Sequence, residues 1–193
     1  NSAGFAIMNS ADYNLNLQDT TKLKDREGLV MKLALQSCVT LEDFENLLKE
    51  LPKPMGVDAN FGVIDAQGGA AYYETSNYSF TKFDANDTKI APFGYIVRTN
   101  FAFTGARKKE YGLIRYQNAE DLFHLAANTQ SLSHQFILEK VTRSLKHSLT
   151  QTDLTINSPE KKLDTRYVNF SDFIPRYSSA ASVVVQGVRP GEP

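Results

Sequence analysis

The amino-acid sequence predicts an α+β fold in which pairs of helices accompany an antiparallel sheet. Apolar residues recur at helical spacing in the first and last thirds of the chain, and strand-like runs separated by short turns fill the middle. Strands and helices do not alternate one by one, as they would in a parallel sheet. We expect residues 1–193 to form a single domain.

One strand and two helices are expected in the first part of the chain. Residues 5–8 form an apolar run that predicts a strand. Residues 21–36 place apolar side chains on one side at helical spacing, which predicts a helix with one buried face. A second helix is expected over residues 41–51, because Thr40 precedes it in an arrangement typical of a capping box and Pro52 prevents its continuation.

The middle of the chain predicts strands over residues 60–65, 70–75, 78–84 and 93–99. The first two are joined by a short turn in which Gly68 and Gly69 supply the positive φ of a tight hairpin. We expect these four strands to form one antiparallel sheet that packs against a second sheet, with the helix pairs outside.

The last part of the chain predicts two further helices, one marked by residues 119–126 and one from residue 132 to about 148. Residues 150–166 are polar and predict a surface loop or flap, and strands are expected near Tyr167 and over residues 181–188. The sequence lacks an initiator Met and ends in a turn that follows a strand. We therefore expect it to be a processed or excerpted piece of a longer protein.

Composition and charge argue against several classes of protein. Hydrophobic residues make up 41% and charged residues 22% of the chain, which is typical of a globular domain and not of a disordered or collagen-like one. The 21 Lys and Arg nearly balance the 22 Asp and Glu, so no overall cationic field attracts nucleic acid or anionic lipid. The apolar stretches are far shorter than the roughly 20 residues that span a bilayer. We expect neither a nucleic-acid partner nor a membrane span.

Residue patterns alone indicate no catalytic or metal centre. The histidines His124, His134 and His147 lack a partner ligand three or four residues away, so no metal site is expected. The glycine pair 68–69 joins two strands instead of opening a helix, which favours a turn over a phosphate-binding loop. Cys38 has no neighbouring base in the sequence, and we interpret it as a buried structural thiol.

Charged residues add little to this interpretation. The basic cluster at residues 107–109 is more typical of a solvated loop than of a binding site. Asp65, Glu74 and Asp84 lie on or beside expected strands without a spacing that indicates a catalytic carboxylate pair.

Four segments, by their residues and their order, indicate a resemblance to a known family. They are residues 4–15 (GFAIMNSADYNL), 60–75 (NFGVIDAQGGAAYYET), 94–101 (GYIVRTNF) and 180–192 (AASVVVQGVRPGE). In this order they resemble the N-terminal-nucleophile (Ntn) hydrolases. The chain is most similar to the choloylglycine hydrolase and penicillin V acylase group and to the related acyl-coenzyme A:6-aminopenicillanic acid acyltransferases. The resemblance covers nearly the whole chain.

This resemblance implies a four-layer α-β-β-α sandwich, incomplete in this chain, and cleavage or transfer of an acyl group at a non-peptide C–N bond. It implies a small-molecule acyl amide as substrate, no cofactor, and a cysteine nucleophile made N-terminal by autoproteolytic processing. That cysteine should precede residue 1, so the remaining segment of the same protein is an expected partner. Cys38 lies too far along the fold to replace it, and Ser2 follows Asn1 and is rejected.

The resemblance also assigns three site residues. Asn100 matches the asparagine that helps to form the oxyanion hole, Asn9 a second active-site asparagine, and Arg115 the arginine that orients the surroundings of the cysteine. Each also has a structural interpretation. Asn100 and Asn9 are suited to turns or caps, and Arg115 to an ion pair with Glu120 or Asp121.

Three hypotheses about function follow. The first is an amide hydrolase or acyltransferase whose nucleophile lies upstream, so that this chain alone is inactive. The second is a catalytically inactive relative that binds acylated small molecules, and the third is an interaction domain without a pocket. The residue that opens the mature upstream segment distinguishes the first two. The sequence leaves substrate identity, cellular compartment and oligomeric state open, with a homo-oligomer among the partners considered.

Overall fold

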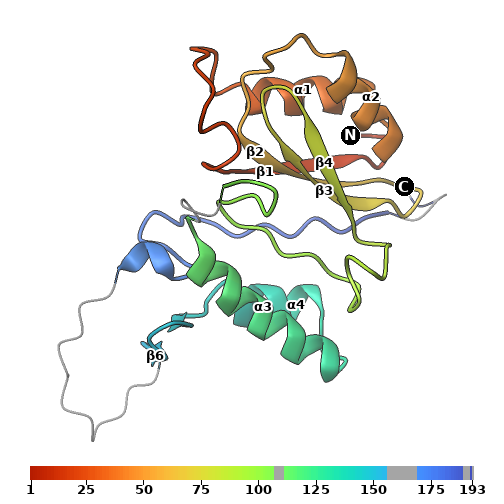
Figure 1. Ribbon diagram of the computed structural model, residues 1–193. Coiled ribbons are helices and arrows are strands. Elements are labelled where there is room, and N and C mark those ends of the chain that lie inside the picture. Colours follow the sequence, from red (N-terminus) through yellow and green to blue (C-terminus); the bar gives the residue numbers. More distant parts are fainter. Residues whose placement is uncertain (107–110, 156–168, 189–191, 193) are drawn as a thin grey trace, which may run out of the picture. The chain divides into compact units, whose positions relative to one another are not determined.

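The computed structural model describes residues 1–106, 111–155, 169–188 and 192 (Figure 1). The chain divides into two compact units, one of Asn1–Tyr111 with Val185–Pro193 and the other of Gly112–Val184. The first unit contains a four-stranded antiparallel sheet with two helices, and the second contains a long helix and a two-stranded sheet. This arrangement confirms the α+β class.

The sheet of the first unit has the strand order β1 (Ala6–Ala11), β2 (Ala59–Ile64), β3 (Ala70–Thr75) and β4 (Phe80–Asp84). All three pairings are antiparallel, and in this register Ser10 lies opposite Asn60, which in turn lies opposite Glu74. The strands expected over residues 60–65, 70–75 and 78–84 are therefore confirmed to within about two residues at each end.

The strand expected over residues 93–99 is wrong, and its place in the sheet is taken by β1. Gly94 has a φ of 74°, which interrupts an extended run. The carbonyls of Thr99 and Phe101 accept hydrogen bonds from side chains of the sheet instead of from a neighbouring strand. The segment thus crosses the sheet as a loop.

Helices α1 (Glu27–Ser37) and α2 (Leu41–Glu50) follow β1. The first begins later than its apolar spacing predicts, because Asp25 has a φ of 61° and the Arg26 amide donates to the Gly56 carbonyl. The second has the predicted capping box. The Thr40 hydroxyl accepts from the Asp43 amide, and the Asp43 carboxylate accepts from the Thr40 amide at 2.9 Å.

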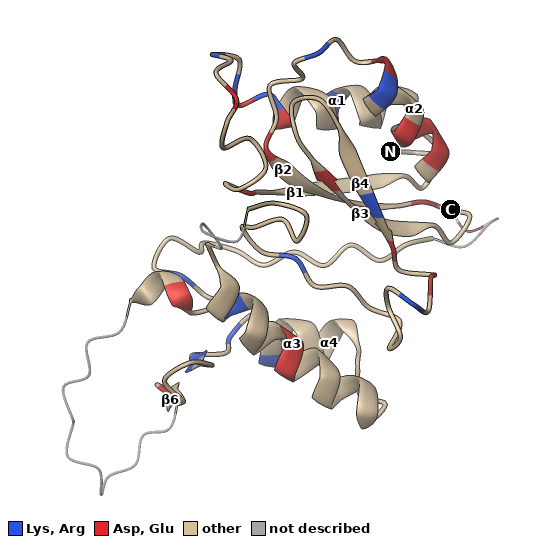
Figure 2. Cartoon of the chain, viewed as in Figure 1, with Lys and Arg blue, Asp and Glu red and all other residues tan. Residues whose placement is uncertain are grey.

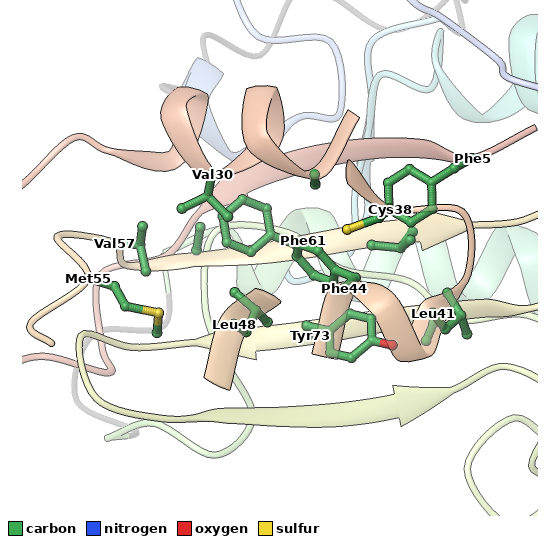
Figure 3. Packing of buried hydrophobic residues seen from close by; sticks show 14 residues of the cluster. Phe5, Val30, Cys38, Leu41, Phe44, Leu48, Met55, Val57, Phe61 and Tyr73 are labelled. Carbon is green, nitrogen blue, oxygen red and sulfur yellow. The ribbon is translucent and has the colours of Figure 1, made fainter. Parts of the chain in front are cut away.

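An aromatic core joins these helices to one face of the sheet (Figure 3). Phe44 of α2 contacts Phe61 and Tyr73 edge-on, with ring centroids 5.8 and 5.1 Å away. Phe5, just before β1, also contacts Phe44. Cys38 is buried in the same cluster, as expected of a structural thiol, and burial raises its pKa. Each buried phenylalanine contributes about 2 to 3 kcal/mol.

The second unit begins with α3 (Leu113–Asn128), which confirms the helix expected around residues 119–126. It continues with the short α4 (His134–Phe136), a π-helical turn η2 (Ile137–Val141), the paired strands β5 (Lys146–His147) and β6 (Thr152–Asp153), and the 3-10 turn η3 (Phe170–Asp172).

The helix expected from residue 132 to about 148 is wrong beyond Val141. The side-chain amide of Asn118 in α3 donates to the Ser144 hydroxyl and to the Lys146 carbonyl. These bonds hold residues 144–146 outside a helix, and β5 begins there.

Three other expectations concern the strand over residues 181–188, the basic cluster at residues 107–109 and the flap over residues 150–166. Residues 181–188 pair with no strand in the described part of the chain, so the strand expected there is not formed. The basic cluster 107–109 lies outside the described residues, as do residues 156–168, which include most of the expected flap and Tyr167. Within the described ranges, no helix combines the length and apolarity needed to cross a membrane.

Candidate functional site

A row of polar residues crosses the face of the sheet that the helices leave open. Ser10, Asn60 and Glu74 lie opposite one another on β1, β2 and β3. Because side chains alternate along a strand, they face away from the aromatic core, to which the neighbouring Phe61 and Tyr73 belong. This polar row anchors the segment that carries Asn100.

The contacts of the row fix the backbone on both sides of Asn100. The Ser10 hydroxyl donates to the Thr99 carbonyl at 2.7 Å. The Asn60 side-chain amide donates to the carbonyls of Thr99 and Phe101, at 3.2 and 3.1 Å. Asn100 is thereby held between two bonded carbonyls.

Glu74 anchors the same segment more strongly. Its carboxylate is fully buried and accepts hydrogen bonds from the backbone amides of Phe103 and Thr104, both at 2.9 Å, and from the Thr104 hydroxyl. The Arg98 guanidinium lies 3.2 Å from the same carboxylate and stacks over the rings of Phe83 and Phe103. A buried charge with this many donors and an adjacent cation is a rigid anchor.

Asn14 provides a third attachment. Its side chain is buried, accepts from the Ala102 amide and donates to the Ala102 carbonyl, each at 2.8 Å. This two-way bond gives Ala102 the partner that a neighbouring strand would otherwise offer. Residues 98–104 therefore have a defined path although they form no regular element.

Asn100 itself reaches the end of β1. Its side-chain amide donates to the carbonyl of Ala11, the last residue of that strand, at 2.7 Å. Asn100 is half-buried. The structure thus places one N–H of the predicted oxyanion residue against the backbone.

Asn9 lies on the other face of the sheet from the Asn100 segment. It is opposite Phe61 in the register, and its neighbour Ser10 points to the Asn100 segment. Since adjacent residues of a strand face opposite sides, the Asn9 side chain lies on the side covered by the helices. The sheet separates the two asparagines, so the structure does not bring them together.

Arg115 belongs to the second unit, where it lies in the first turn of α3 and is half-buried. The helix begins after Gly112, whose φ of 84° is the left-handed conformation that glycine adopts readily. The roles that the resemblance assigns to Arg115 and Asn9 stay predictions.

The histidines lie apart from the Asn100 segment in the chain. His147 is buried in the second unit, where Nδ1 accepts from the Thr150 amide and Nε2 lies 3.7 Å from an Asp172 oxygen. No group of three or more His, Cys, Asp or Glu that could hold a metal ion is found among the residues that the structure describes.

The residues that sequence reasoning missed are those that position Asn100, above all Glu74, Asn60 and Asn14. The sequence contained a signal for them. Asn60 and Glu74 lie within otherwise apolar strands, and Asn14 comes shortly after one. Buried polar groups need partners, so such residues mark places where another segment must dock.

Comparisons of the chain with protein-family models, curated proteins and solved structures found no match. The resemblance to N-terminal-nucleophile hydrolases therefore rests on the four segments quoted above and on their order.

Proposed function

We propose that this chain is part of an amide hydrolase or acyltransferase that acts on a non-peptide C–N bond of an N-acylated small molecule. Its nucleophile is an N-terminal cysteine in a preceding segment of the same protein. The observation that supports this proposal is the anchoring of Asn100, whose flanking carbonyls are held by Ser10 and Asn60 and whose segment is tied to Glu74.

In the proposed reaction, the cysteine sulfur attacks the substrate carbonyl carbon while its own α-amino group takes up the thiol proton. The carbonyl oxygen becomes an oxyanion, and an N–H of Asn100 donates to it. Collapse of this intermediate breaks the C–N bond, and the leaving amine takes the proton from the α-amino group. Water then cleaves the thioester in hydrolysis, and a second amine does so in acyl transfer.

A fixed donor matters for this chemistry because the charge on oxygen develops only in the transition state. A donor that already points at that position needs no reorganisation, and losing one oxyanion donor typically costs about 3 to 4 kcal/mol. The buried ion pair of Glu74 and Arg98 would provide this rigidity. In the proposal the Asn100 side-chain amide, which is positioned at the end of β1, donates to the oxyanion.

The proposal includes the complete four-layer sandwich. The sheet with α1 and α2 on one face supplies two of its layers. On the face away from the helices, a Cβ built on Gly187 would lie 3.6 Å from the Ile64 side chain, so the chain returns to this face, against which the proposed second sheet would pack.

A second candidate function is binding of acylated small molecules without catalysis. The hydrogen bond from Asn100 to Ala11 favours it, since this contact gives the side chain a structural role that needs no substrate. Both candidates predict binding of an acyl amide, and only the first predicts a covalent intermediate.

The test uses the full-length protein. Its N-terminal sequence and intact mass are determined before and after incubation with a series of chromogenic acyl amides. The proposal expects a mature N-terminal cysteine that gains the mass of one acyl group. A mature segment that opens with any residue other than Cys, Ser or Thr, together with binding but no adduct, would establish the second candidate instead.

A further inference from the structure

The first unit contains an acidic cavity of about 310 Å³ where β1 ends and α1 and β2 begin. Acidic segments, red in Figure 2, gather at these three places. The charged residues that line the cavity are five acids and one base: Asp12, Asp19, Asp25, Glu27, Asp58 and Lys24. The lining therefore carries an excess of carboxyl groups over ammonium groups.

Two of these carboxyl groups lie together, that of Asp12 buried and that of Asp58 half-buried. Asp12 is 1% exposed, and its backbone amide donates to the Asp58 carbonyl at 3.0 Å. Neither side-chain oxygen of Asp12 has a hydrogen-bond partner of normal geometry in the described part of the chain, and the same holds for the buried Oδ1 of Asp58. A buried carboxylate without a partner is costly, so the pair needs either a shared proton or a cation.

Two of the neighbouring acids, Asp19 and Glu27, have hydrogen-bond partners. Asp19 accepts from the Thr21 amide and from the Asn77 side chain, and Glu27 accepts from the Asp58 amide at 3.0 Å. These bonds shape the wall of the cavity. Asp12 and Asp58 differ from Asp19 and Glu27 because they have buried side-chain oxygens that accept no hydrogen bond of normal geometry.

The size and lining of the cavity favour an organic cation over a metal ion. The volume is that of a small ligand pocket and far exceeds a single ion. Neither this cavity nor the rest of the described residues contains a group of three or more His, Cys, Asp or Glu that could hold a metal ion. Leu23 and Val57 also line the cavity and offer apolar contact to a hydrocarbon stem.

We propose that this cavity binds the primary ammonium group of a small organic amine, with the ammonium between Asp12 and Asp58 and its alkyl stem against Leu23 and Val57. An ammonium group has three N–H donors and no acceptor, so on binding it takes the place of the proton that the carboxyl pair otherwise shares and leaves both carboxylates as acceptors. This binding is independent of the acyl chemistry proposed above.

The test measures binding of 1-butylammonium to the purified chain by calorimetry near neutral pH, with 1-butanol as the neutral probe of similar shape and calcium chloride as the metal probe. Saturable binding of butylammonium and none of butanol is expected. Asp12→Asn should weaken the affinity about 10- to 100-fold, since charge-assisted hydrogen bonds are lost. Glu50→Gln, which removes an exposed acid of α2, is the matched control and should bind like the unaltered chain.

Circular dichroism checks that each variant is folded, and Asp58→Asn replaces Asp12→Asn if the latter is not. Equal binding of butanol and butylammonium, or equal affinities of the unaltered chain and the Asp12 variant, would overturn the proposal. Binding of calcium but not of the amine would identify a metal site instead. Absence of any binding would show that the carboxyl pair is satisfied by a shared proton.

Discussion

At the scale of single residues, Glu74 makes three hydrogen bonds and one ion pair through a single buried carboxylate. Its carboxylate forms an ion pair with Arg98 and accepts hydrogen bonds from two backbone amides that lie about 30 residues later in the chain. Replacing it would leave a cation that is 7% exposed without its carboxylate. Stability and the position of Asn100 both depend on this residue.

We therefore predict that Glu74→Ala lowers the free energy of unfolding by about 3 to 5 kcal/mol, the usual cost of removing one partner of a buried ion pair. Urea denaturation followed by circular dichroism measures this change. Glu50→Ala, on the exposed side of α2, is the control and should cost almost nothing. A loss below about 1 kcal/mol for Glu74→Ala would contradict the role of anchor.

Asn100 carries the catalytic prediction. In the full-length protein, Asn100→Ala should lower the acylation rate about 100- to 1,000-fold, because one oxyanion donor is lost. The folded state should lose only about 1 kcal/mol with the bond to Ala11. Single-turnover kinetics with a confirmed substrate measures the rate.

Asn86→Ala serves as the control for this measurement, since Asn86 is an exposed asparagine that donates to the Gly68 carbonyl of the hairpin. Its acylation rate should match that of the unaltered protein. If Asn100→Ala also leaves the rate unchanged, Asn100 has no part in the mechanism and its role is structural.

Asp12 makes stability depend on pH. Burial, and then the adjacent Asp58, raise its pKa from 3.8 to about 9, although the Asn14 amide acts in the opposite direction. Between these values the folded chain holds a proton that the unfolded chain has released. The contribution of Asp12 to stability is thus present at low pH and is lost as the pH rises towards 9.

In amine-free buffer, the free energy of unfolding should decrease from about pH 5 to about pH 9, and it should decrease less in Asp12→Asn, which has no carboxyl group to titrate. Urea denaturation at several pH values across this interval tests the prediction. Parallel curves for the unaltered chain and the variant would show that Asp12 does not titrate in this range.

At the scale of elements, α2 is the helix whose start is most completely specified by the sequence. Thr40 and Asp43 exchange hydrogen bonds across its first turn. Thr40→Ala should lower the free energy of unfolding by about 1 kcal/mol, whereas Thr40→Ser keeps the accepting oxygen and should lower it by much less. Thermal or urea denaturation compares the two. Equal losses would mean that the methyl group of Thr40, and not its hydroxyl, matters.

Two of the elements that the sequence mispredicts fail for a common reason. Residues 93–99 have the alternation of a strand and residues 132–148 the spacing of a helix, yet side chains from elsewhere bind their backbone or the backbone that follows. The Asn60 side-chain amide donates to the carbonyls on either side of Asn100, and the Asn118 side-chain amide donates to the Lys146 carbonyl. Local periodicity does not reveal such partners, because they come from distant positions in the chain.

At the scale of the whole molecule, we predict that the chain of 193 residues forms no acyl-enzyme by itself. Its cysteine is buried, and burial raises the thiol pKa, so little reactive thiolate is present. Ser2 is preceded by Asn1, whose α-amino group donates to the Phe5 carbonyl.

Incubation with a chromogenic acyl amide followed by intact-mass analysis tests this prediction, with the full-length protein as the positive control. No adduct is expected on the chain, and activity should return when the preceding segment is joined or co-expressed. Turnover with a stable acyl group on Ser2, Cys38 or any other residue of this chain would require a different nucleophile and a different mechanism.

By itself, the sequence determined the features whose signals are local. These are the α+β class, the capping box of α2, the hairpin between β2 and β3 with its positive φ at Gly68, and the buried state of Cys38. Asn100 was singled out by resemblance alone. The chemistry of these signals lies within a few neighbouring residues, so it can be recognised before the chain is folded.

Only the tertiary structure decided which side chains meet. The register of β1 places Asn9 on the helix-covered face and Ser10 on the other, a distinction that depends on one residue of strand alternation. The contacts of Glu74 with residues 98–104 and the pairing of Asp12 with Asp58 join positions about 25 to 45 residues apart. Such contacts form because buried polar groups must find partners, and the fold determines which partners are within reach.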